Sequence, residues 1–245
     1  MARIDELLRE GLAKLPPKPS DKASQSDKKR YSEQVSQAIA AAFGDELRQR
    51  GLKEARPAPP GLLGGSGAER RMAGGIGAKK VDVTWATEES GLLLGVSVKS
   101  INFRDVKTNN FQKNLINRRG DMLIEAVTLH RRFPYAVLGG FVFLDKDAAD
   151  DSTARRRSTL ENAHARLRLF TGREDPAGRD EQYERMYLVL LDANPFSPSV
   201  VIHAVGDPKT VIALEYIFDD LLTLVAERNP DFYECVNGKL RKATG

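Results

Sequence analysis

Two charged side chains interrupt apolar sequence in the first half of the chain. Asp82 stands in the run KKVDV, and Lys99 ends the run GVSVK. Each has an ordinary structural explanation alone, because a lysine at a strand end often extends to solvent and an aspartate near a turn often caps it. Two charges among apolar residues cost free energy unless they pair or bind a metal ion. Together, Asp82 and Lys99 therefore predict a polar site.

Phosphodiester hydrolysis is one reaction that such a pair could serve. A carboxylate can hold Mg²⁺, which polarises a phosphoryl oxygen and acidifies a bound water. An ammonium group can orient that water or stabilise the charge that develops during reaction. Mg²⁺ commonly takes one or two protein carboxylates, with water and phosphate in its remaining positions.

The elements around the pair predict a β-hairpin. Residues 78–87, AKKVDVTWAT, are typical of a strand, EESG at 88–91 of a turn, and LLLGVSVKSI at 92–101 of a second strand that is buried on both faces. Side chains alternate between the two faces of a strand. Pairing about the turn places Asp82 opposite Ser97, with Lys99 two residues along on the same face.

The rest of the chain predicts a mixed α/β fold with a central mixed β-sheet and helices on both sides. Helices are expected at 1–15, 31–52, 109–132, 152–171 and 209–228, and further strands at 135–145, 186–193 and 199–205. In the second helix, Gly44 is expected to interrupt and Gly51 to end the helix. The Pro/Ser/Lys-rich residues 16–30 indicate an N-terminal helix and flexible basic arm over 1–30, followed by a single domain over 31–245.

Composition limits the class of protein. The chain has 245 residues, of which 41% are hydrophobic and 29% charged, and a net charge of +4 that is compatible with a phosphate-bearing partner. No apolar run approaches the roughly 20 residues that span a bilayer, so no membrane partner is expected. The N-terminus lacks the apolar segment of a signal peptide, and the single cysteine, Cys235, excludes an intramolecular disulfide. A cytoplasmic location is therefore expected.

The hairpin resembles the PD-(D/E)XK nucleases, and type II restriction endonucleases most closely. The resemblance covers a motif core of residues 69–145, with GAKKVDVTW, LLLGVSVKS, a long helix and a further strand. It implies a restriction-endonuclease-like fold and a Mg²⁺-dependent endodeoxyribonuclease, with Mn²⁺ as a substitute metal. The motif Asp and Lys correspond to Asp82 and Lys99, although Val81 stands where the motif has Pro. The motif's second acid is replaced by Ser97, a form similar to a branch that draws this carboxylate from elsewhere in the chain.

Four glutamates could supply the missing carboxylate. Glu69, in the Gly-rich approach to the first strand, is the preferred candidate. Glu46 comes second, because it falls on the apolar face of its helix. Glu33 lies near the start of that helix, where related nucleases often carry a supporting glutamate. Glu125 comes fourth, because it points away from an apolar stripe through Ile116, Leu123, Ala126, Val127 and His130, so we expect it to face solvent.

The resemblance also implies roles for neighbouring groups. Asp82, Glu69 and the backbone carbonyl of Val98 would bind the metal, and Lys99 would orient the attacking water. Ser97 is expected to be structural or to make a weak contact beyond the metal ligands. Two polar side chains on the apolar stripe of the next helix, Gln112 and Arg119, need partners and are candidates for supporting roles.

The sequence leaves more than one function open. The first hypothesis is a type II-like restriction enzyme or another phage-defence nuclease that acts on DNA as a homodimer, with one site for each strand and possibly an accessory defence-system subunit. The second is a catalytically inactive nuclease-fold module that binds nucleic acid or a partner protein, which the serine at position 97 favours. The third is a structural or assembly protein in which Asp82 and Lys99 form an ordinary ion pair.

Overall fold

The computed structural model describes residues 2–59 and 70–244. The helices and short 3₁₀ turns are α1 (Arg3–Ala13), α2 (Gln25–Gln49), η1 (Gln112–Asn114), α3 (Leu115–His130), η2 (Lys146–Ala149), α4 (Thr159–Leu167), η3 (Arg168–Phe170) and α5 (Leu214–Arg228). The strands are β1 (Arg70–Ala73), β2 (Ala78–Val81), β3 (Val83–Thr87), β4 (Gly91–Ile101), β5 (Val137–Asp145), β6 (Arg185–Asp192), β7 (Ser199–Ala204), β8 (Tyr233–Val236) and β9 (Lys239–Lys242).

A mixed sheet forms the centre of the fold, as the sequence predicted. Within the described residues it has five strands in the order β3-β4-β5-β6-β7. The inner strands β4, β5 and β6 run parallel, and the edge strands β3 and β7 pair antiparallel with their neighbours. Strands β1–β2 and β8–β9 form two separate antiparallel ribbons.

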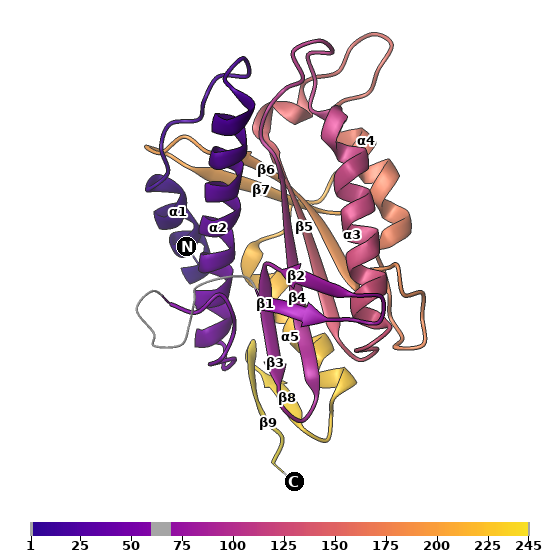
Figure 1. Ribbon diagram of the computed structural model, residues 1–245. Coiled ribbons are helices and arrows are strands. Elements are labelled where there is room, and N and C mark those ends of the chain that lie inside the picture. The colour runs from indigo at the N-terminus through magenta and orange to yellow at the C-terminus, as the bar shows by residue number, and fades with distance from the viewer. Residues whose placement is uncertain (1, 60–69, 245) are drawn as a thin grey trace.

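Helices cover both faces of this sheet (Figure 1). The ribbon shows α1 and α2 on one side and α3 and α4 on the other. Val96, Val98 and Phe141 of the sheet belong to the core that contains α1, α2 and α5. Leu138 and Val142, which point to the other side, belong to the core that contains α3 and α4. The predicted three-layer α/β arrangement is confirmed.

The predicted N-terminal helix is confirmed by α1, whereas the segment predicted as a flexible arm is partly helical. In α1, Ile4, Leu8 and Leu12 are buried in the same core as α2. Helix α2 begins at Gln25 rather than near residue 31, because the Ser24 hydroxyl accepts the backbone N–H of Asp27 and caps the helix. The last part of the predicted arm is therefore helical.

The two glycines of α2 behave differently from each other. The helix runs through Gly44 without interruption, so the predicted break is wrong; a glycine inside a helix costs only about 1 kcal/mol relative to alanine. Gly51 follows the C-cap with φ +106°, and a Cβ there would lie 2.1 Å from the Leu240 carbonyl oxygen. Gly51 therefore ends the helix as predicted, because a side chain is excluded by both the conformation and the space.

The strand predicted for residues 78–87 is divided at Asp82. Its first half, β2, pairs with β1, whereas its second half, β3, joins the central sheet. Other elements also differ from the sequence prediction. The ribbon β8–β9 lies where only a tail was expected, α3 starts at Leu115, and α4 starts at Thr159 because Ser158 and Glu161 form a capping box.

Candidate active site

Next to Asp82 the hairpin strands adopt the register that the sequence predicted, and a shift between Trp85 and Ala86 changes the pairing by one residue nearer the turn. Val83 pairs with Val96 and Thr84 with Gly95, so the strand order carries Asp82 to the level of Ser97. Asp82 itself lies at the bend between β2 and β3, where its Oδ2 accepts the backbone N–H of Val98 at 2.6 Å. Because strand side chains alternate and Val98 faces the α2 side, Ser97 and Lys99 face α3.

Lys99 lies between two carboxylates. Its Nζ is 3.4 Å from Asp82 Oδ2 and 3.3 Å from Glu125 Oε2. The side chains of Lys99 and Asp82 are each 14% exposed and that of Glu125 is 6% exposed. The pair inferred from the hairpin is therefore part of a partly enclosed triad with one positive and two negative groups.

The inward position of Glu125 corrects the prediction that it faces solvent. The buried residues of α3 are Leu115, Met122, Glu125, Ala126, Thr128, Leu129 and His130. By contrast, Ile116, on which the predicted stripe was drawn, is 55% exposed. The helix is rotated relative to the predicted stripe, so Glu125 points to the sheet. A stripe drawn through Leu115, Met122, Ala126 and Leu129 would have placed Glu125 correctly.

Burial and charge act in opposite directions on the triad. Burial raises the pKa of Glu125, as does the neighbouring Asp82, and the positive charge of Lys99 only partly opposes this. Burial acts to lower the pKa of Lys99, but the charges of Glu125 and Asp82 outweigh it, so that the pKa is raised. Lys99 is therefore held as a protonated ammonium between the two carboxylates.

Ser97 and Tyr183 complete the surroundings of Glu125. The Ser97 hydroxyl is buried beside Glu125 and lowers its pKa, although it makes no well-formed hydrogen bond within the described residues. The Tyr183 hydroxyl lies 3.4 Å from Glu125 Oε1 and 3.3 Å from the Met122 carbonyl oxygen. Sequence reasoning missed Tyr183, since a tyrosine just before an apolar strand gives no signal that distinguishes it from a core residue.

The other sequence candidates do not join the triad. Glu46 is buried as predicted, but on α2, on the opposite side of the sheet, where it pairs with Arg50 at 2.6 Å. Glu33 is 58% exposed and lies 3.8 Å from Lys29. Glu69 lies outside the described residues.

The two supporting polar residues of the predicted stripe also lie elsewhere. Gln112 is in η1, and its Nε2 donates to the Arg157 carbonyl oxygen at 3.4 Å. The Arg119 guanidinium lies over the Phe170 ring, 5.9 Å from its centroid. Among the described residues, neither side chain makes a hydrogen bond or ion pair with Asp82, Lys99 or Glu125.

The side chains of the triad that could bind a metal ion fit a cation that needs few protein ligands. The described part of the chain contains no group of three or more His, Cys, Asp and Glu side chains that could hold a metal ion. Two carboxylates remain possible ligands, in Asp82 and Glu125, and Mg²⁺ is commonly bound through one or two carboxylates with water in its other positions. The set is less suitable for Zn²⁺, which prefers sulfur and nitrogen ligands in a closed tetrahedron.

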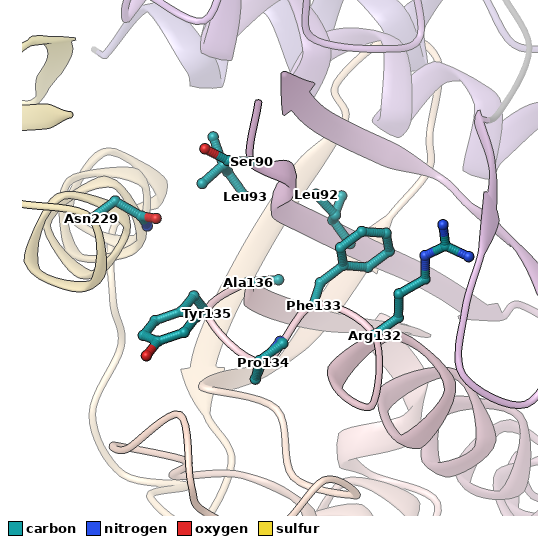
Figure 2. A pocket seen from close by; sticks show the side chains of 9 residues that line it. All are labelled: Ser90, Leu92, Leu93, Arg132, Phe133, Pro134, Tyr135, Ala136 and Asn229. Atoms are coloured by element: carbon teal, nitrogen blue, oxygen red, sulfur yellow. The ribbon is translucent and has the colours of Figure 1, made fainter. Parts of the chain in front are cut away.

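A hollow of about 240 Å³ lies away from the triad, at the start of β4 (Figure 2). Leu92, Leu93 and Ala136 line it together with Arg132, Phe133 and Tyr135. Figure 2 shows the Tyr135 and Phe133 rings on opposite sides of this hollow. It has no acidic side chain in its lining, so it is not a candidate for cation binding.

No protein-family model, curated protein or solved structure matches the chain. Among the described residues, no helix is both long enough and apolar enough to cross a bilayer. The triad of Asp82, Lys99 and Glu125 is therefore the feature of the chain that points to a function.

Proposed function

We propose that this chain is a Mg²⁺-dependent endodeoxyribonuclease, of the type II restriction or another phage-defence class, as its resemblance to the PD-(D/E)XK nucleases implies. The observation that carries the proposal is the position of Lys99 Nζ between the carboxylate oxygens of Asp82 and Glu125. Glu125 supplies the carboxylate that the motif has at position 97, where this chain has Ser97. It takes the role expected of Glu69, because its carboxylate lies next to the predicted pair.

The protein groups have distinct tasks in this proposal. Asp82 and Glu125 would hold Mg²⁺, with Mn²⁺ as a substitute. A strand residue directs its N–H and C=O to the same side, so the Val98 carbonyl, like its N–H, faces Asp82 and could add a third ligand. The bound cation supplies Lewis-acid polarisation of the phosphate and acidification of a water.

Lys99 has the remaining chemical task. Its protonated ammonium is held close to both carboxylates, where it can orient the attacking water and stabilise negative charge on the phosphate. The net charge of +4 favours a polyanionic partner. Cleavage of both strands of duplex DNA favours a homodimer with one site for each strand. The single free cysteine, Cys235, is compatible with a cytoplasmic location.

Plasmid cleavage tests the proposal. Purified protein is incubated with supercoiled plasmid, with and without Mg²⁺, beside the variants Asp82→Asn, Lys99→Ala and Glu125→Gln. We expect cation-dependent nicking or linearisation. The cleavage rate of each variant should fall by at least about 100-fold, because even the loss of a residue that only supports a metal ligand lowers metal affinity or activity by about 10- to 100-fold.

Glu46→Gln is the matched control, because it neutralises another buried glutamate on the opposite side of the sheet. It should cut at the wild-type rate if its folded fraction, measured by circular dichroism, is unchanged. Cleavage that survives all three site substitutions would exclude this site. Tight, salt-dependent DNA binding without cleavage would instead favour a binding module.

A further inference from the structure

We infer that Tyr183 is a positioning residue that fixes the Glu125 carboxylate, holding Oε1 so that Oε2 faces Lys99 and Asp82. The inference rests on the proposed function, because it assigns Tyr183 a role in forming the cation site. Tyr183 acts through Glu125: within the described residues, its hydroxyl makes hydrogen bonds to Glu125 and to the Met122 carbonyl, and none to Asp82 or Lys99.

The two oxygens of Glu125 are held from different sides. The Tyr183 hydroxyl is 3.4 Å from Oε1, and Lys99 Nζ is 3.3 Å from Oε2. A hydroxyl has one hydrogen to donate, and the Tyr183 hydroxyl has two acceptors in reach, Glu125 and the Met122 carbonyl. The two distances are nearly equal, and a hydrogen bond to an ionised acceptor is stronger than one to a neutral carbonyl, so donation to Glu125 is the stronger choice when its carboxylate is ionised.

The backbone around Tyr183 is held in place by hydrogen bonds and by the buried neighbour Glu184. The Tyr183 backbone N–H donates to the Phe170 carbonyl at 2.8 Å, and its carbonyl accepts the Arg173 N–H at 3.2 Å. The next residue, Glu184, is fully buried and pairs with Arg173 at 3.0 Å and Arg228 at 2.6 Å. Tyr183 therefore precedes β6 in a segment that is anchored through both its backbone and its neighbour.

The same anchor reaches the helix that carries Glu125. His130, at the C-terminal end of α3, has its Nε2 3.4 Å from Glu184 Oε2. The Leu138 N–H of β5 also donates to Glu184 Oε2, at 2.6 Å. The Glu184 carboxylate thus links the start of β5 to the residue beside Tyr183, and the His130 ring of α3 lies against it without a well-formed hydrogen bond.

Gly140 leaves space for the Tyr183 ring because it has no side chain. It pairs with Ser97 in the parallel β4–β5 register. A Cβ at Gly140 would lie 3.2 Å from Tyr183 Cδ1 and 2.8 Å from Met122 Cε. The strand beside the triad is therefore shaped to admit Tyr183, and a phenylalanine would fill the same volume without the hydroxyl.

Binding of Mg²⁺ alone tests the inference, with no DNA and hence no turnover. Isothermal titration calorimetry compares the wild type, Tyr183→Phe and Tyr187→Phe. Tyr187 is the matched control, because it is another buried tyrosine on the same stretch of chain and belongs to the core on the opposite side of the sheet. We expect Tyr183→Phe to weaken Mg²⁺ binding by about 10- to 100-fold, and Tyr187→Phe to leave it unchanged.

Three outcomes separate this inference from the proposed function. Wild-type affinity in Tyr183→Phe overturns the positioning role and leaves the nuclease proposal intact. A lowered unfolding temperature with wild-type affinity also overturns it, because Tyr183 would then act only in packing. If the wild type itself binds no Mg²⁺ at millimolar concentration, the cation site fails and the inference fails with it.

Discussion

Replacing Lys99 with methionine removes the only positive charge that the described residues place between Asp82 and Glu125. Methionine keeps most of the volume of the side chain, so the packing of β4 against α3 is largely preserved. Two carboxylates then face each other with little solvent to screen them, since Asp82 is 14% and Glu125 6% exposed. We expect Lys99→Met to destabilise the fold in the absence of a divalent cation.

The distances set the size of the effect. With an effective dielectric constant of about 20, charges at 3.3 and 3.4 Å attract each other by about 5 kcal/mol for each pair. Much of this attraction is offset by the desolvation of the lysine, which methionine avoids. Removal of one partner from a buried ion pair typically costs about 3–5 kcal/mol. We therefore expect the free energy of unfolding to fall by about 3–5 kcal/mol at neutral pH.

The direction of the pH dependence follows from Glu125. Burial already raises its pKa, and loss of Lys99 removes the charge that opposes this. A carboxylate whose pKa is higher in the folded than in the unfolded state destabilises the fold when it is ionised. The free energy of unfolding of Lys99→Met should therefore rise again as the pH falls through the folded-state pKa of Glu125 and the carboxylate becomes protonated. On the proposed cation site, millimolar Mg²⁺ should also restore stability, because a ligand that binds only the folded state stabilises it.

Urea unfolding of metal-free protein, followed by circular dichroism, measures these effects. Lys146→Met is the matched control, because Lys146 pairs with Asp192 at 2.7 Å but is 59% exposed, and such surface pairs contribute about 0–1 kcal/mol. The double variant Lys99→Met/Glu125→Gln should recover stability, since it leaves a single carboxylate. A Lys99→Met protein no less stable than Lys146→Met would refute the reasoning.

Two further predictions concern the support of the triad. Gly140→Ala places a Cβ 2.8 Å from Met122 Cε, so urea unfolding should show a loss of about 1–3 kcal/mol, and unchanged stability would mean that the neighbours move freely. For Glu184, burial acts to raise the pKa, but His130, Arg228 and the Leu138 N–H outweigh it and lower the pKa. Its stabilisation is therefore present above its ordinary pKa of about 4.5 and lost as the pH falls through its folded-state value. Unfolding of Glu184→Gln at a series of pH values should show a deficit that shrinks on acidification, and a constant deficit would contradict this sign.

The hairpin could be predicted because strand geometry is strict. Side chains alternate with a period of two, and a short turn fixes the pairing, so Asp82, Ser97 and Lys99 could be assigned to one face from sequence alone. The split at Asp82 could not, because both halves of the run are compatible with a strand. The first half pairs with β1, which lies in the Gly-rich approach where no strand was expected, and the second half pairs with β4 in the central sheet.

The face of α3 that packs against the sheet could not be predicted in the same way. Apolar residues occur around most of this helix, so more than one stripe is possible, and Ile116 and Ile124 are exposed at 55% and 49% although both are apolar. The predicted stripe therefore overlaps the buried face only in part: Ala126 and His130 are buried, whereas Ile116 is exposed. The buried face is set by Met122 and Leu129 against the sheet, and this contact also turns Glu125 inward.

The serine at position 97 and the glutamate at position 125 are then two parts of one arrangement. Both face the same space above β4, and the small buried Ser97 leaves room in which the Glu125 carboxylate reaches Lys99. A long acid at position 97 would compete for that space and would add a third negative charge beside one ammonium, which the low exposure of the triad would make costly. A small, uncharged residue at position 97 is thus compatible with a second acid that comes from a helix, as the proposed function assumes.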